Sequence, residues 1–219
     1  MARIELWNGD ICDLEVDAIV SPASTTLWMS AGVASELKRT GGDAIEFAAV
    51  RQGPRQIGDA VVTDAGRLAA KVVVHAVSLE RDRRTSAHAI DRAARSAMAR
   101  VRELGLQSVA FPALGTGIGG FPLDQAARVA VEAVRDELRT PSSIEHVVFA
   151  LRGATAYEAF AAALSAGEPS PSRPVLATSS PGADGTGGDG TNDAAGASEP
   201  SAPSVLPGPD APASPEGGA

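Results

Sequence analysis

The sequence has one cysteine, Cys12, which excludes an intramolecular disulfide and a cysteine-based zinc cluster. No apolar run approaches the roughly 20 residues that a membrane-spanning helix needs, so we expect no membrane partner. Residues 1–166 also lack the excess of positive charge that would draw them onto nucleic acid by counterion release. Because residues 3–7 lack the layout of a signal peptide, we expect a soluble, cytoplasmic protein.

Proline, glycine and negative charge are unevenly distributed along the 219 residues. Residues 167–219 hold 10 of the 15 prolines and 10 of the 23 glycines, and contain no Phe, Trp or Tyr. With seven acidic residues and one basic residue their net charge is −6, which leaves −2 of the total −8 for residues 1–166. Such a segment cannot bury enough apolar surface to offset the entropy of ordering it. We therefore expect one folded domain over residues 1–166 and a disordered acidic tail over residues 167–219.

The apolar pattern of residues 1–166 alternates between strand and helix periods. Short β-branched runs predict strands, and repeats of about 3.6 residues between them predict helices. The expected strands lie at 4–6, 18–20, 60–63, 72–74, 108–111 and 145–151, and the expected helices at 33–40, 44–52, 86–104, 123–138 and 154–164. This alternation favours an α/β fold with a mainly parallel sheet, whose ligands bind at the carboxyl ends of the strands.

Residues 111–122, Phe-Pro-Ala-Leu-Gly-Thr-Gly-Ile-Gly-Gly-Phe-Pro, follow an expected strand and precede an expected helix. Glycines in this position let backbone N–H groups approach a phosphate closely, and a tight turn without a ligand is the alternative. A Walker loop is excluded because Phe121 and Pro122 stand where it needs Lys followed by Ser or Thr. A Rossmann site is disfavoured because it needs an acid at the end of the next strand, whereas Glu132 and Asp136 lie on the following helix.

A second loop, residues 22–32, follows the second expected strand and leads into a helix that begins near Gly32. The helix N-terminus supplies free N–H donors, although this loop taken alone favours a hydroxyl-rich turn without a ligand. Together, the two loops could hold a diphosphate from both sides.

Five segments, in this order, resemble the macrodomain family: residues 9–11, 17–20, 32–34, 74–77 and 112–122. The resemblance covers residues 2–164 and implies a three-layer α/β/α sandwich around a mixed, mainly parallel sheet. Macrodomains bind ADP-ribose, and some of them also hydrolyse ADP-ribosyl esters or related linkages. The resemblance therefore implies ADP-ribose or an ADP-ribosylated macromolecule as the partner. We expect no metal, no cofactor, no nucleic acid unless it is ADP-ribosylated, and a monomer.

The resemblance also implies roles for individual residues. Asp10, with the Ile11 backbone, would bind the exocyclic amine of adenine; a turn cap is the alternative role for Asp10. Gly32 and Val33 would face the diphosphate and the distal ribose. The residues expected to wrap the diphosphate are Gly115, Thr116, Gly117, Ile118 and Gly119. Arg152 stands where many relatives place an aromatic over adenine, and would either stack on the base or be a solvated surface arginine.

The sequence departs from the family pattern where hydrolysis would occur. Residues 21–24, Ser-Pro-Ala-Ser, replace the usual Asn-Ala-Ala-Asn, so Ser24 is the candidate catalytic residue in place of the last Asn. Residues 29–33, Met-Ser-Ala-Gly-Val, replace a run of glycines, and Ala34 and Ser35 follow where hydrolytic relatives carry an acid. Losing groups that position water lowers the rate more than it weakens ground-state binding.

Three functions remain open. The first is binding of ADP-ribose or ADP-ribosylated targets through the two loops. The second is an ADP-ribosyl hydrolase acting on protein, nucleic acid or ADP-ribose derivatives. The third is an interaction scaffold with a degenerate pocket, in which the acidic tail is the working part.

Four further features have two readings each. His75 is either a buried core residue that hydrogen-bonds to the backbone, or a functional group. Cys12 is either a packing residue or a nucleophile. Trp28 lines the pocket or caps the core. Residues 81–84, Arg-Asp-Arg-Arg, form a solvated loop or steer a polyanion.

Overall fold

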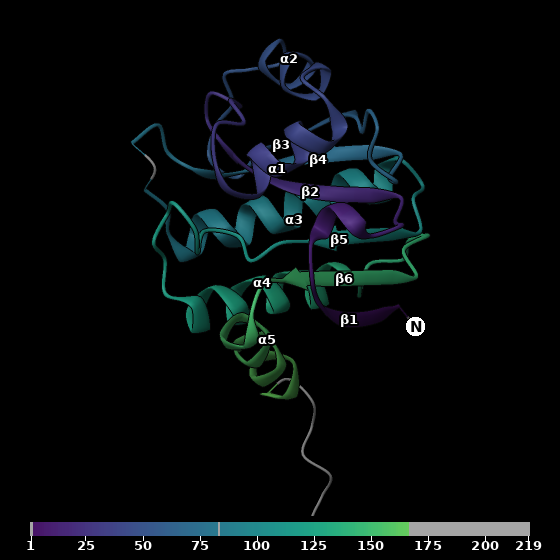
Figure 1. Cartoon of the computed structure of the whole chain (residues 1–219). Coiled ribbons are helices and arrows are strands. Elements are labelled where there is room, and N and C mark those ends of the chain that lie inside the picture. The colour runs from purple at the N-terminus through teal and green to yellow at the C-terminus, as the bar shows by residue number, and fades with distance from the viewer. Residues whose placement is uncertain (1, 83, 167–219) are drawn as a thin grey trace, which may run out of the picture. The chain divides into compact units, whose positions relative to one another are not determined.

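A six-stranded sheet lies at the centre of the computed structural model, which describes residues 2–82 and 84–166 (Figure 1). Its strands follow the order β1-β6-β5-β2-β4-β3. In chain order the elements are β1 (Arg3–Asn8), the 3-10 turn η1 (Ile11–Asp13), β2 (Ala18–Ser24), α1 (Gly32–Gly41), α2 (Ala44–Val50), β3 (Ala60–Asp64), β4 (Val72–Leu79), α3 (Ala87–Glu103), β5 (Ser108–Phe111), α4 (Leu123–Glu137), β6 (His146–Leu151) and α5 (Ala154–Ala166). The expected tail, residues 167–219, lies outside the described residues, so the division of the chain at residue 166 stays a prediction.

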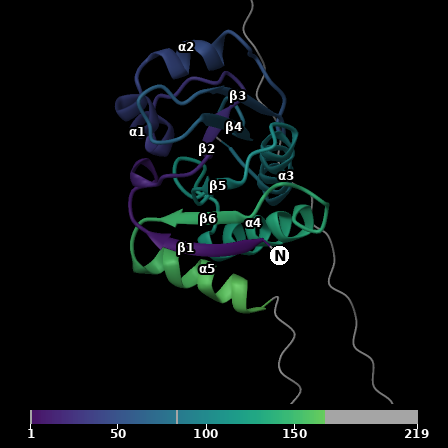
Figure 2. The same ribbon diagram turned by 90° about the vertical axis from the view of Figure 1, so that its right-hand side faces the viewer.

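Four of the five neighbouring strand pairs in the described sheet are parallel, and β3 runs antiparallel to β4. Helices α3, α4 and α5 contribute to the apolar cluster on one face, and α1 and α2 to the clusters on the other. Figure 2 shows α1 and α3 on opposite sides of β2 and β4. The prediction of a three-layer α/β/α sandwich around a mixed, mainly parallel sheet is therefore confirmed.

The two faces of the sheet receive alternate residues of each strand, as the period of a strand requires. On the α3 side, Phe149 packs between Phe111 and Phe160, with ring centroids 5.9 and 4.9 Å apart. The helices on this side pack closely because their buried positions are mostly alanine. The buried alanines are Ala89, Ala93, Ala94 and Ala97 in α3 and Ala126, Ala127, Ala130 and Ala133 in α4.

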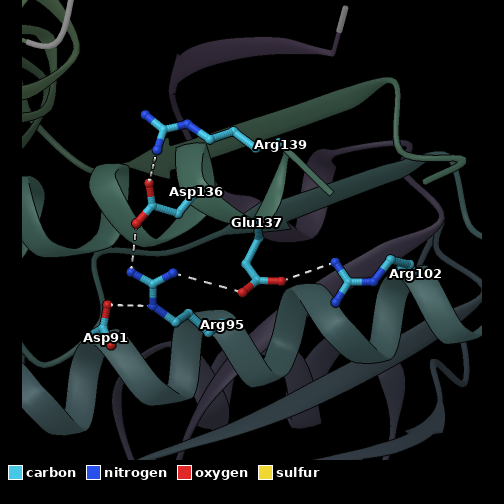
Figure 3. A network of polar contacts seen from close by, with 6 residues as sticks. All are labelled: Asp91, Arg95, Arg102, Asp136, Glu137 and Arg139. Carbon is cyan, nitrogen blue, oxygen red and sulfur yellow. Dashed lines mark hydrogen bonds and ion pairs between the residues drawn. The ribbon is translucent and has the colours of Figure 1, made fainter. Parts of the chain in front are cut away.

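A network of ion pairs joins α3 to α4 (Figure 3). At its centre, the Arg95 guanidinium lies 2.8 Å from a carboxylate oxygen of Asp91 and 2.9 Å from one of Asp136. The remaining members of the network are Arg102, Glu137 and Arg139. The network therefore links the C-terminal end of α4 to α3.

Both β2 and β4 are longer than their apolar runs predict. They pair with each other through Ser24 and Leu79, so the second loop begins at Thr25, whereas the sequence places its start at Pro22. Proline has no N–H to give to a ladder. On its other side, β2 pairs with β5 only at Ala18 and Ile19, so that side needs no donor from Pro22.

No helix in the described ranges is long and apolar enough to cross a membrane.

Asp17 ties the first residues of three parallel strands together. Its Oδ2 accepts hydrogen bonds from the N–H groups of Gln107 and Ser108 at 2.8 and 3.1 Å, and its Oδ1 lies 2.7 Å from Lys71 Nζ. The hydrogen bond from Lys71 is the main reason that the pKa of Asp17 lies below its usual range. The amino ends of β2, β4 and β5 are thereby aligned, and their carboxyl ends meet at the opposite edge.

Asp17→Asn is expected to lower the free energy of unfolding by about 2 kcal/mol at pH 7, because several hydrogen bonds lose a charged acceptor. A carboxylate whose pKa is lowered by folding stabilises the protein above the unfolded-state pKa of about 3.9. The difference between variant and wild type therefore shrinks as the pH falls through the lower folded-state value. Urea denaturation at pH 7 and at acidic pH measures both effects. Glu15→Gln, an exposed control on the same segment, is expected to change little; a loss as large as that of Asp17→Asn would contradict the assignment.

Candidate functional site

A cavity of about 290 Å³ opens at the carboxyl ends of β2, β5 and β6, where an α/β sheet binds its ligands. It lies between the first turn of α1 and the glycine-rich loop. Its lining comprises Pro22, Ala31, Gly32, Val33, Leu79, Pro112, Ala113, Gly115, Thr116, Gly117, Ile118, Gly119, Ala150, Leu151, Arg152 and Ala156. Two smaller cavities adjoin it through shared lining residues. One, of about 180 Å³, extends towards Ser24, and the other, of about 20 Å³, lies beside Asp10.

The glycine-rich loop presents unpaired backbone donors along this cavity. Its turns are closed through carbonyl groups: Gly115 C=O accepts from the N–H of Phe121 at 3.0 Å, and Gly117 C=O from that of Gly120 at 3.1 Å. Within the described ranges, the N–H groups of residues 115–119 donate to no protein acceptor. Unpaired N–H groups beside a cavity are suited to an anionic oxygen, because such donors are rarely left without a partner.

Two of the loop's glycines are required by packing. Gly115 has a positive φ of 80°, and a Cβ on it would lie 2.6 Å from Ile90 Cδ1. A Cβ on Gly119 would lie 2.7 Å from the carbonyl oxygen of Gly115. Gly117 differs from both, because a Cβ there would meet no heavy atom within 4 Å. The absence of a side chain at Gly117 therefore keeps the cavity open, whereas at Gly115 and Gly119 it lets the loop fold.

The first turn of α1 presents a second set of donors to the same cavity. Its N-cap residue, Ala31, has no side chain that could accept a hydrogen bond from the turn. Ser35 N–H reaches Ala31 C=O at 3.4 Å, but the N–H groups of Gly32, Val33 and Ala34 find no acceptor among the described residues. A helix N-terminus also carries partial positive charge from the aligned peptide dipoles. The expected diphosphate residues thus line one cavity from two sides.

Asp10 and Arg152 form an ion pair beside the smallest cavity. Asp10 Oδ1 accepts from the Cys12 N–H at 3.0 Å, as the expected turn cap, and Oδ2 accepts from Arg152 Nη2 at 2.5 Å. The backbone hydrogen bond from Cys12 is the largest cause that lowers the pKa of Asp10, with Arg152 contributing, so the carboxylate is ionised at neutral pH. The Ile11 N–H donates to no acceptor in the part of the chain that is described. Arg152 is therefore held at Asp10 by an ion pair, with its side chain 59% exposed.

Ser24, the candidate catalytic residue, lies on the cavity of about 180 Å³. Its Oγ is 3.0 Å from Thr26 Oγ1, and Ser30 adds a third hydroxyl-bearing residue to the lining. None of the lining residues of this cavity is a carboxylate or a histidine. A hydroxyl with no adjacent base is weakly nucleophilic, so this arrangement offers little general base catalysis.

Cys12 and His75 take structural roles. Burial raises the pKa of the Cys12 thiol to about 11, so it stays protonated at neutral pH and is a poor nucleophile. His75 is fully buried, and its Nε2 lies 3.0 Å from Thr63 Oγ1. One ring nitrogen of the expected core histidine therefore has a side-chain hydroxyl as its partner, whereas the sequence predicts a backbone partner.

A larger cavity, of about 460 Å³, runs along the edge strand β3 beside the last turn of α3. There, the edge of β3 is partly covered: Gln52 Nε2 donates to Val62 C=O at 2.8 Å, and Arg100 Nε to Ala60 C=O at 3.2 Å. Both hydrogen bonds occupy carbonyl groups of β3, whereas the cleft beside α1 is distinguished by two sets of N–H groups without an acceptor among the described residues.

The sequence gives no sign of the residues that support the glycine-rich loop from behind. Thr85 and Leu79 lie against Gly119, and Thr85 Oγ1 donates to Ser78 C=O at 2.6 Å. Both supports come from the end of β4 and the loop that follows it, and no spacing pattern relates them to residues 115–119.

Trp28 is half-exposed on the cavity near Ser24, so it does not cap the core.

Comparison with known proteins identifies the family of this chain. Residues 20–130 match the model of the Macro domain family. The chain belongs to the Macro domain family. This macrodomain is 42% identical over 168 residues to an uncharacterized protein of Mycobacterium tuberculosis, a match that covers 77% of this chain and 46% of the relative. The chain thus spans less than half the length of that relative.

A deacetylase and a solved macrodomain complex are also similar to this chain. The macrodomain is 37% identical over 154 residues to the O-acetyl-ADP-ribose deacetylase of Salmonella gallinarum, covering 68% of this chain and 86% of that protein. It superposes on the crystal structure of a Trypanosoma brucei macrodomain in complex with ADP-ribose with a TM-score of 0.68 and 26% identity. That superposition covers 74% of this chain and 68% of the other chain. The family that the five sequence segments suggest is therefore confirmed.

Proposed function

We propose that this macrodomain binds ADP-ribose, free or attached to a macromolecule, in the cavity between α1 and the glycine-rich loop. One observation carries the proposal: two sets of unpaired backbone N–H donors line the same cavity of about 290 Å³. Such donors neutralise a diphosphate without basic side chains, and the helix N-terminus adds favourable potential. The Trypanosoma brucei relative in complex with ADP-ribose supports the same ligand.

The smaller cavities suggest how the two ends of the ligand are held. Adenine belongs beside Asp10, whose ionised carboxylate accepts a hydrogen bond from the exocyclic amine, while the unpaired Ile11 N–H offers a donor next to it. Arg152, already paired with Asp10, lies close enough to stack its guanidinium on the base. The distal ribose then extends from the main cavity towards Ser24.

Calorimetric titration of the full chain with ADP-ribose tests the proposal. We expect one molecule bound per chain. Adenosine and ribose 5-phosphate are expected to bind at least about a hundredfold more weakly, because neither carries the diphosphate that both sets of donors would hold. Absence of ADP-ribose binding, or equally tight binding of ribose 5-phosphate, would contradict the proposal.

An ADP-ribosyl hydrolase is the second candidate, favoured by the 37% identity to an O-acetyl-ADP-ribose deacetylase. Against it, the cavity at Ser24 has hydroxyl groups but no carboxylate or imidazole in its lining, so the substrate's own phosphates would have to orient the attacking water. Incubation with ADP-ribosylated protein separates the two functions. Binding predicts capture without release, whereas release that is slowed by Ser24→Ala would establish hydrolysis.

A further inference from the structure

The unpaired donors of α1 can hold an anion only if the segment that leads into the helix keeps them in place. The first turn of α1 has no side-chain cap to fix it, because its N-cap residue is Ala31. The preceding residues 25–31 belong to no helix or strand. Contacts with the rest of the protein must therefore determine where the donors lie.

The backbone of this segment is strained at Leu27. Its φ is 63°, in the left-handed region that a leucine rarely adopts. Such a conformation costs free energy and persists only where the surrounding structure enforces it. Leu27 is buried in one apolar cluster with Ala49 of α2, and Met29 is buried in another with Ile45 of the same helix. Helix α2 therefore belongs to the structure that holds the strained segment.

One polar side chain of α2, Glu46, joins this segment to α1. Its Oε2 accepts a hydrogen bond from the Met29 N–H at 2.7 Å. Lys38 Nζ, in the last turn of α1, donates to Oε1 and Oε2 of the same carboxylate at 3.1 and 3.2 Å. The Glu46 side chain is 8% exposed, so salt screens these contacts little. Hydrogen bonds to a charged group are also about twice as strong as those between neutral groups.

These contacts tie both ends of α1 to one carboxylate. Met29 lies two residues before the N-cap, and Lys38 lies in the last turn of the helix. Glu46 itself is not among the described residues that line the main cavity, so its effect on a ligand there has to pass through α1. The groups of a binding site must be held within about 0.5 Å of their productive positions.

We propose that Glu46 is a positioning residue of the anion site: by holding Met29 and Lys38, it keeps the N–H groups of α1 directed at the diphosphate. The inference rests on the proposed function. Donors that are already in place need no reorganisation when the ligand arrives, so less of the binding free energy is lost. Removing the carboxylate should therefore weaken binding of the diphosphate and leave the adenine end unaffected.

Glu46→Gln tests the inference in the full chain, because the amide keeps the shape of the side chain but loses the charge that holds Lys38. We expect ADP-ribose, measured by calorimetry, to bind about tenfold more weakly. Adenosine, measured by NMR titration, carries no diphosphate and should keep its wild-type affinity. In the free variant, the amide shifts of residues 32–34 should change, whereas those of residues 115–119 should not.

Two further variants separate positioning from a general loss of stability. Asp17→Asn is the matched control: it is expected to destabilise the fold at the opposite edge of the sheet, and should bind ADP-ribose like the wild type. Lys38→Gln is the milder change at the ion pair, because its amide still donates to Glu46, and it serves if Glu46→Gln fails to fold. We expect it to weaken ADP-ribose binding about threefold without affecting adenosine.

The outcomes distinguish the inference from the proposed function. The inference is overturned, while the proposed function stands, if the wild type binds ADP-ribose and both Glu46→Gln and Lys38→Gln bind it as tightly. The same conclusion follows if adenosine is weakened by the same factor as ADP-ribose, or if Asp17→Asn loses as much affinity as Glu46→Gln. If wild-type protein does not bind ADP-ribose, the proposed function fails and the inference fails with it.

Discussion

Replacing Gly117 by glutamate is expected to weaken ADP-ribose binding at least about a hundredfold while the fold is retained. A Cβ on Gly117 meets no heavy atom within 4 Å, and the residue needs no positive φ, so a side chain can be added without moving the loop. The new carboxylate would lie beside the diphosphate. Two like charges about 4 Å apart near a protein surface repel by about 4 kcal/mol, which corresponds to far more than a hundredfold in affinity.

Calorimetry with ADP-ribose measures this loss, and circular dichroism checks the fold. Gly117→Gln separates size from charge, because it adds a side chain of nearly the same shape without the carboxylate and should lose much less affinity. Thr140→Glu adds the same charge just beyond the far end of α4, and should bind like the wild type. Wild-type affinity in Gly117→Glu would show that the diphosphate lies elsewhere.

Stability is expected to fall by about 3 kcal/mol as the pH is lowered from 6.5 to 4, because of His75. Burial lowers the pKa of His75 to about 4, against about 6.5 in the unfolded chain. Between these pH values His75 binds a proton in the unfolded chain but not in the folded protein. The free energy of unfolding therefore decreases as the pH is lowered, and it levels off below pH 4. Nothing nearby offsets the charge, since Nδ1 of His75 has no hydrogen-bond partner among the described residues.

Urea denaturation at several pH values between 4 and 7 measures this dependence. His75→Gln keeps an amide that can bond to Thr63 but does not titrate, so most of the slope in this window should disappear. His88→Gln, at an exposed histidine, should keep the wild-type slope. Asp10 and Asp17 have lowered pKa values, so their contributions begin to change near the low end of this window; they are present in wild type and in His75→Gln alike and leave the difference between the two slopes unaffected. An unchanged slope in His75→Gln would contradict the prediction.

Local patterns in the sequence predict most of the fold. Period-2 and period-3.6 repeats locate the strands and helices, because these repeats reflect which side of each element is buried. They do not locate the last residues of β2 and β4: Ser24 and Leu79 are strand residues because the two strands pair there, and the alternation of apolar residues has already ended.

The candidate site is predicted less completely, because its contacts join distant segments. The glycine pattern identifies residues 115–119 as a loop that could hold a phosphate, but not that Gly115 and Gly119 are required by contacts with Ile90 and Thr85. Likewise, the Asp10–Arg152 pair has no local signature.

The unpaired donors of the glycine-rich loop and of α1 belong to the main chain, and this has an evolutionary consequence. A side-chain substitution cannot delete a peptide N–H unless it introduces proline or moves the loop. Mutations can therefore change the side chains around the cavity while its backbone donors remain in place. Selection for a different ligand would act instead on the residues that shape the two ends of the cleft.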